Sequence, residues 1–300
     1  MNINNTETIS NLSSSRSYCP FEKGASAFDL VIGLITAIAL LPTTLLNAFI
    51  ILAVMKRREL QKPSNILLSS MAITDLLNGV IVMPISATSD FFILRQVSYE
   101  HICTLNAVNM FFGPLLSTAT LHHLTIIAWE RYMAVQKWMD YKLKITNGCL
   151  KKISIGTSLS SLLPTVVYFT SSSVSGDRAF VGGVVTLWVA LKTVCLFLDA
   201  FFYRKVYLGI RNRKLNEISQ IDDLMKARLE SKVAKTTGLL SVMVIPSFIP
   251  IFVFAVLGNV IPVFQTNSAL RFTQILTQLT SLLNPLLYCY RDHRFRNALR

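Results

Sequence analysis

Several ionisable residues of this 300-residue chain stand inside or at the ends of long apolar stretches, where they could do chemistry that their neighbours cannot. Asp75, Lys192 and Asp199 lie within such stretches, and Glu130-Arg131 closes another. A charged group in apolar surroundings is costly, so each is a candidate for a functional role. A carboxylate among hydroxyl and amide oxygens suits a hard cation, and a guanidinium between two carboxylates makes strong bidentate hydrogen bonds.

The motifs of common enzymes are missing from the chain. It contains no nucleotide-binding Gly loop, no Cys-x-x-Cys and no His-Glu-x-x-His, so we expect no enzyme activity. The net charge of +13 and the pI of about 9.7 could suggest nucleic acid as a partner. The basic residues, however, lie in short runs between apolar stretches, a pattern that marks the cytoplasmic face of a membrane protein.

The composition predicts a membrane protein. Hydrophobic residues make up 52% of the chain and charged residues 15%, whereas soluble domains carry about a quarter charged residues. A helix needs about 20 mostly apolar residues to cross a bilayer. Seven segments qualify, and they predict an all-α membrane protein, a seven-transmembrane helix bundle: about 28–55, 65–93, 103–135, 150–172, 181–208, 232–257 and 268–290.

The distribution of Lys and Arg predicts the orientation of these spans. Most of the 29 basic residues lie in segments near 56–64, 131–151, 204–235 and 291–300, so these segments are expected inside. The N-terminus is then extracellular and the C-terminus cytoplasmic in a multi-pass plasma-membrane protein. Residues 1–27 are predicted to be a disordered extracellular tail, with Asn4 and Asn11 as candidate glycosylation sites.

An ordered set of polar and Pro residues recurs along the spans. Its members are Asn47, Asp75, Glu130-Arg131-Tyr132, Tyr203 with Val206, Glu230 with Pro250, and Asn284-Pro285-Leu286-Leu287-Tyr288. This set resembles the signatures of the class A (rhodopsin-like) G-protein-coupled receptors over residues 28–300. The resemblance implies a receptor domain over residues 28–290 and the start of a short amphipathic helix eight over residues 291–300.

The resemblance also implies an activation switch. At rest, Arg131 would bridge Glu130 and Glu230, and ligand binding would break this link, open helix six and admit a heterotrimeric G protein. An alternative is that Arg131 reaches lipid phosphates from a helix end. The further switch residues that the resemblance implies are Tyr132, Tyr203, Phe248, Pro250, Asn284, Pro285 and Tyr288.

A sodium site is implied around Asp75. The resemblance brings this carboxylate beside the oxygen-bearing side chains of Asn47, Thr120, Ser281 and Asn284. Such oxygens suit an allosteric sodium ion. A protonated Asp75 that is hydrogen-bonded within the bundle is the alternative. No other cofactor is expected.

The ligand itself cannot be named from the sequence. Gly113 stands where receptors for biogenic amines carry Asp, which argues against a simple cationic amine, and Gln278 stands where opsins carry the retinal-binding Lys. Lys192 could meet an acidic ligand group, form an internal pair or extend toward the membrane surface. The candidate pocket residues are Gly113, Lys192, Phe248, Arg271, Gln274 and Gln278.

The chain departs from the family in its cysteines. Cys103 lies 28 residues before Arg131 rather than the usual 25, and residues 164–181 contain no Cys, so the usual disulfide to the second outer loop cannot form. Cys103 either pairs with Cys19 or is a free thiol. This departure, together with Cys195 in place of a Pro, gives a weak similarity to melanocortin, cannabinoid and lysophospholipid receptors.

Two classes of function remain open. The first is a receptor whose partners are an extracellular ligand, a G protein and membrane lipids, but no nucleic acid. The second is a transporter or channel that uses the charges of Asp75, Lys192 and Asp199 within the membrane. Transporters usually show internal repeats or pairs of broken helices, and the sequence has neither.

Overall fold

The computed structural model describes residues 27–95, 97, 99–174, 178–216, 238–239, 242, 244–254, 257, 267–291 and 295. All regular elements among these residues are helices. They are α2 (Ala27–Lys56), η2 (Arg58–Leu60), α3 (Pro63–Leu77), η3 (Asn78–Val82), α4 (Met83–Leu94), α5 (Tyr99–Gln136), α6 (Trp138–Lys144), α7 (Asn147–Ser160), α8 (Leu162–Val174), α9 (Arg178–Asn216) and α11 (Asn267–Arg291). A further helical segment covers Val244–Phe254.

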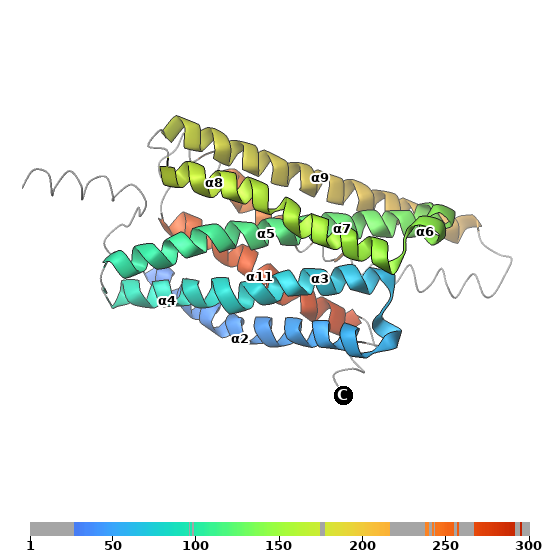
Figure 1. The fold of residues 1–300 in the computed structure, drawn as a ribbon, viewed down its shortest axis with the longest axis horizontal. Helices are drawn as coiled ribbons and strands as arrows, with labels where there is room; N and C mark the ends of the chain where they lie inside the picture. Colours follow the sequence, from blue (N-terminus) through green and yellow to red (C-terminus); the bar gives the residue numbers. More distant parts are fainter. Residues whose placement is uncertain are drawn as a thin grey trace, which may run out of the picture.

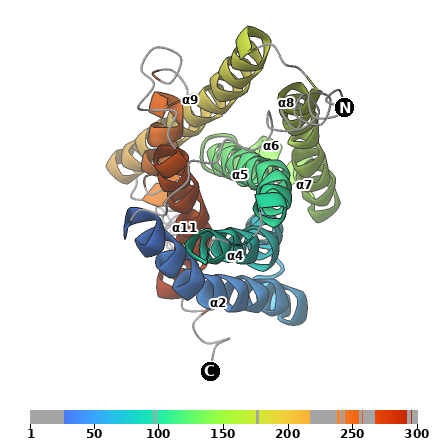
Figure 2. The same cartoon turned by 90° about the vertical axis from the view of Figure 1, so that its left-hand side faces the viewer.

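The long helices lie side by side along the longest axis of the molecule (Figure 1), and α5 lies inside the group when the bundle is seen end-on (Figure 2). Apolar side chains point outward: Leu34, Ile38, Leu163 and Phe197 are all at least 60% exposed. Polar groups such as Asp75, Asn284 and Gln278 are buried. This inverted distribution is the one that a lipid environment favours, because helices satisfy their backbone groups internally and hide polar side chains against one another.

Five helical stretches are long and apolar enough to cross a membrane: Ala27–Lys56, Pro63–Leu94, Glu100–Gln136, Asn147–Ser172 and Phe180–Asn212. They coincide with the first five predicted spans. The sixth is described only in part, as Val244–Phe254. The seventh is the 25-residue helix α11, in which Gln, Thr and Asn residues dilute the apolar ones. The predicted all-helical bundle is confirmed, and the predicted tail, with Asn4 and Asn11, lies outside the described residues apart from Ala27.

Two spans are not continuous α-helices. The second consists of α3 and α4 joined by η3, a π-helical turn that begins three residues after Asp75. The fourth consists of α7 and α8, which meet at Ser161. Local sequence explains where these spans begin: Pro63 opens α3, where its missing N–H costs nothing, and the Thr146 hydroxyl caps α7 by accepting from the Cys149 amide.

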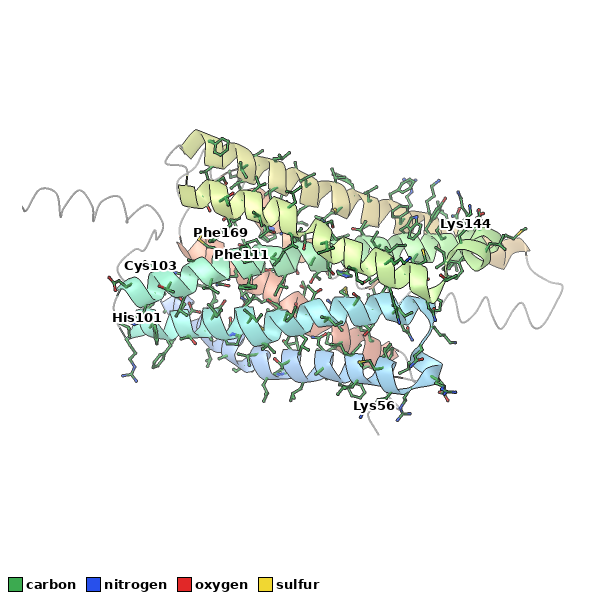
Figure 3. The ribbon with its side chains drawn as sticks, viewed as in Figure 1. Lys56, His101, Cys103, Phe111, Lys144 and Phe169 are labelled. Atoms are coloured by element: carbon green, nitrogen blue, oxygen red, sulfur yellow. The ribbon has the colours of Figure 1, made fainter. Side chains whose placement is uncertain are left out.

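The two ends of the bundle differ in chemistry. Figure 3 shows His101 and Cys103 at one end, and Lys56 and Lys144 at the other. We call these the Cys103 end and the Lys56 end. Cys103 is disulfide-bonded, whereas Cys149, Cys195 and Cys289 are free thiols. Cys19 lies outside the described residues, so its pairing with Cys103 stays a prediction.

Candidate functional site

Asp75 is the centre of a buried polar network between α3, α5 and α11. Its side chain is fully buried. One carboxylate oxygen accepts hydrogen bonds from the hydroxyls of Thr120, at 3.3 Å, and Ser281, at 2.8 Å. The other accepts from the Asn284 amide at 2.7 Å. Three donors from two other helices therefore converge on one carboxylate, which we call the Asp75 cluster.

Two asparagines extend the Asp75 cluster. Asn78, in the η3 turn, donates to the Ser281 hydroxyl at 3.0 Å. Asn47 does not bond to Asp75; its amide donates to the backbone carbonyls of Ser281 and Thr43, both at 2.9 Å. Asn47 therefore ties α2 to α11 rather than completing the carboxylate's shell. The role of Asn78 was not predicted, although a polar residue three positions after Asp75 lies near it on a helix.

The donor set of the Asp75 cluster fits a hard cation. A carboxylate, two hydroxyls and an amide supply oxygen ligands, as Na⁺ and similar ions prefer. The amide oxygen of Asn284 is buried and has no hydrogen-bond partner among the described residues. A buried acceptor without a partner costs free energy, so this oxygen remains available to an ion.

A second buried charge lies at the Lys56 end. The Arg131 guanidinium forms an ion pair with Glu130, with Nε to Oε2 at 2.5 Å and Nη2 to Oε1 at 2.6 Å. The Tyr141 hydroxyl of α6 donates to the same carboxylate at 2.6 Å. Glu130 is fully buried and Arg131 nearly so. Tyr141 belongs to none of the motifs quoted above, and Glu230 lies outside the described residues.

The other predicted switch residues are spread over α5, α9, helix six and α11. Phe248 and Tyr288 are buried in the main apolar core, and Tyr288 packs on Phe295 with ring centroids 6.5 Å apart. Tyr203 on α9 faces the start of helix six, because a Cβ on Gly238 would lie 3.5 Å from its ring. Tyr132 packs on Phe202, and Pro250 and Pro285 lie within helices.

A polar cavity lies between α2, α4, α5 and α11. These four helices are neighbours in the end-on view (Figure 2). The space among its lining side chains, together with the solvent-open region into which it leads, is about 310 Å³. Nine of its eleven lining residues are polar or charged, which gives the cavity its name here. They line it together with Ile32 and Ile275: Thr36, Ser86, Ser89, Asp90, Asn106, Asn109, Arg271, Gln274 and Gln278.

An ion pair and a shared hydroxyl organise this polar cavity. Arg271 pairs with Asp90 of α4, and its Nη1 also lies 3.8 Å from Asp29 of α2. Three amides converge on the Ser86 hydroxyl: Asn109 at 3.1 Å, Gln278 at 2.9 Å and Gln274 at 3.5 Å.

The predicted pocket residues separate into two groups. Arg271, Gln274 and Gln278 line the polar cavity, and Gly113 lies at its edge, with Gln274 3.9 Å from where a Cβ would stand. Lys192 is not among the lining residues. It is buried on α9, donates to Ser117 at 3.0 Å, and lies 3.8 Å from the Trp188 ring centroid and 5.4 Å from that of Phe248.

Five polar members of the polar cavity were not predicted: Thr36, Ser86, Ser89, Asn106 and Asn109. None of them belongs to the motifs quoted above. Aromatic contacts close the neighbouring side of the bundle, where Phe111 of α5 and Phe169 of α8 point toward each other (Figure 3) with centroids 5.4 Å apart.

Comparison with known proteins identifies the class of the chain. Residues 46–288 match the family model for the 7 transmembrane receptor (rhodopsin family). The chain belongs to this family, and is therefore a G-protein-coupled receptor.

Named relatives come from the same class. The chain is 27% identical to Trace amine-associated receptor 1 of Mus musculus, over 97% of this chain and 92% of the relative. It is 27% identical to Trace amine-associated receptor 13c of Danio rerio, over 90% and 84% of the two chains. It is 29% identical to 5-hydroxytryptamine receptor 1B of Vulpes vulpes, over 64% and 51%. The weak similarity to melanocortin, cannabinoid and lysophospholipid receptors stays a prediction.

Proposed function

We propose that the chain is a plasma-membrane receptor that binds an extracellular ligand at the Cys103 end and activates a heterotrimeric G protein at the Lys56 end. The observation that carries the proposal is the buried Glu130–Arg131 ion pair, because a charge pair held inside the bundle is costly unless it serves a rearrangement. The orientation rests on basic residues such as Arg57, Arg58 and Lys62, which follow α2 at the Lys56 end.

The switch works by exchange of hydrogen-bond partners. At rest, Glu130 pairs with Arg131 of the same helix and accepts a hydrogen bond from Tyr141 of α6. In the active state helix six moves outward, Arg131 leaves Glu130, and the groove that opens accepts a helix of the G protein. Glu230, which lies outside the described residues, would restrain helix six through Arg131 at rest, and Pro250 and Pro285 would provide the hinges.

The Asp75 cluster regulates this switch as a sodium site. Asp75, Thr120, Ser281 and Asn284 would hold the ion through oxygen atoms from three helices. A bound ion favours the arrangement in which these helices are close together and therefore stabilises the resting state.

The ligand enters from the Cys103 end. Gln278 supplies no amine for a retinal Schiff base, and Gly113 supplies no carboxylate for an amine, so neither ligand can be bound at those positions in the manner of opsins or biogenic-amine receptors. The candidate pocket comprises Gly113, Arg271, Gln274 and Gln278 around the polar cavity, with Lys192 and Phe248 linking the ligand to helix six.

The test of this function is nucleotide exchange on a G protein in membranes that contain the full chain. Arg131→Ala should abolish the exchange that the unmodified receptor produces, because the groove then lacks its central cation. Lys144→Ala is the matched control: it removes an exposed cation at the same end and should leave exchange unchanged. Equal exchange by Arg131→Ala and unmodified receptor at equal surface expression would overturn the proposal.

A further inference from the structure

We infer that the polar cavity binds a ligand with a primary ammonium group, and that Asp90 is the anionic anchor of this ligand. The inference rests on the proposed receptor function and specifies its ligand class. It moves the recognition of an amine from position 113, where this chain has Gly, to the carboxylate on α4 that lines the cavity.

The charges around the cavity allow a cation to enter without leaving Arg271 unpaired. Arg271 lies between two carboxylates, paired with Asp90 and 3.8 Å from Asp29. All three side chains are less than a fifth exposed. When an ammonium group takes Asp90, the guanidinium keeps Asp29 as its partner. One ion pair is thereby exchanged for two, and no buried charge is left alone.

A second observation points to a hydrogen-bond donor in the ligand. The side-chain oxygen of Asn109 is buried and has no hydrogen-bond partner among the described residues. Asn109 as a whole is only 8% exposed, and it lines the cavity. Its amide nitrogen already donates to Ser86, so only the acceptor is left over. An ammonium group carries three N–H donors and no acceptor, which complements this oxygen together with the Asp90 carboxylate.

Two glycines make room for this arrangement. A Cβ on Gly113 would lie 3.6 Å from the partnerless oxygen of Asn109, so a larger side chain at 113 would fill the space beside that acceptor. A Cβ on Gly33 would lie only 3.0 Å from the Asp90 Cβ, so a side chain there would press Asp90 away from α2. Gly33 therefore lets Asp90 lie close to α2, and Gly113 leaves space beside the Asn109 oxygen.

An anionic ligand fits the same cavity poorly. Arg271 is the only cation among the eleven lining residues, and it already forms an ion pair with Asp90. An anion would have to displace that carboxylate and would then lie beside the negative charges of Asp90 and Asp29. Lys192, the buried cation on α9, contacts Trp188 and Ser117 and is not part of the lining.

The inference can be tested by direct binding to the purified full chain in detergent, without a G protein. The probes are benzylamine, 2-phenylethylamine and cadaverine, each with its alcohol counterpart: benzyl alcohol, 2-phenylethanol and 1,5-pentanediol. At least one amine should raise the thermal unfolding temperature dose-dependently, and its alcohol should not. Asp90→Asn should weaken that binding at least about tenfold, as expected for the loss of a charged hydrogen-bond partner.

Three further variants make the result specific. Asp90→Glu should restore part of the binding, and Asn109→Leu, which leaves the Asp90–Arg271 pair intact, should weaken it. Asp140→Asn is the matched control, because it removes an exposed carboxylate at the Lys56 end and should bind the amine as the unmodified chain does. Asp90→Glu and Asn109→Leu keep the test decisive if Asp90→Asn fails to fold.

Three outcomes would overturn the inference: no stabilisation by any amine at millimolar concentration, equal stabilisation by the alcohols, or binding that Asp90→Asn leaves unchanged. Each of these leaves Arg131-dependent nucleotide exchange untouched as evidence for the receptor. Conversely, amine binding through Asp90 without such exchange would remove the proposed function and keep the binding site.

Discussion

The Asp75 cluster and the polar cavity are both built around an aspartate of the second span, but they are satisfied to different degrees. Asp75 is fully buried and accepts three hydrogen bonds from α5 and α11. Asp90 pairs with a guanidinium that also approaches Asp29, beside a cavity and a partnerless Asn109 oxygen.

This difference separates a network that joins helices, and offers the Asn284 oxygen to an ion, from a site with an exchangeable ion pair. A carboxylate whose donors come from neighbouring helices fixes the relative positions of those helices, and removing it leaves several buried donors unpaired. A site with an exchangeable ion pair and a surplus acceptor has partners to offer to a molecule from outside. The second span therefore carries Asp75, which holds helices together, and further along Asp90, which can pair with a ligand.

The largest difference should appear in stability. Asp75→Leu leaves the hydroxyls of Thr120 and Ser281 and the amide of Asn284 without their acceptor. At about 1 kcal/mol or more for each buried unsatisfied group, the free energy of unfolding should fall by about 3 kcal/mol. Unfolding of the purified chain in mixed micelles measures this. A loss below about 1 kcal/mol would contradict the view that Asp75 holds the three helices together.

A smaller difference concerns sodium. NaCl should raise the unfolding temperature of the unmodified chain relative to N-methylglucamine chloride at equal ionic strength. Asp75→Asn should remove this shift, because the neutral amide no longer attracts the ion. Asp90→Asn should retain it. A sodium shift that survives Asp75→Asn but disappears in Asp90→Asn would move the ion site to the polar cavity.

The smallest effect is expected for Asn109→Leu without any ligand. The substitution removes one hydrogen bond to Ser86, which keeps Gln278 and Gln274 as donors. It also removes the partnerless oxygen, so the net change in the free energy of unfolding should stay within about 1 kcal/mol. A loss as large as that of Asp75→Leu would mean that Asn109 belongs to a structural network after all.

The helical bundle and the neighbours of Asp75 could be predicted from the sequence. Long apolar stretches leave few alternatives to membrane-spanning helices. The resemblance to a known family then brought Thr120, Ser281 and Asn284 around Asp75, and the structure has all three hydrogen-bonded to it. Asn47 was expected in the same shell, but it bonds to backbone carbonyls instead.

The polar cavity could not be assembled in the same way. Arg271, Gln274, Gln278 and the neighbouring Gly113 were expected at the pocket, each through its position on a helix, but so were Lys192 and Phe248, which do not line the cavity. Ser86 and Asn109 meet because α4 and α5 present particular faces to each other. The faces depend on helix rotation and tilt, and a shift of one residue turns a side chain by about 100°. Tyr141 escaped prediction for a similar reason, because α6 folds back onto Glu130.

The π-helical turn η3 separates the two aspartates, and it has a consequence for how such a chain can evolve. A turn closed by i→i+5 bonds contains one residue more than an α-helical turn, so it shifts the phase of everything that follows. Deleting a single residue such as the outward-facing Val80 would straighten the span and swing Ser86 and Asp90 away from the cavity, with Asp75 left in place. Insertions and deletions at this turn can therefore change which ligand the cavity binds, while Asp75 and the residues that contact the G protein keep their positions.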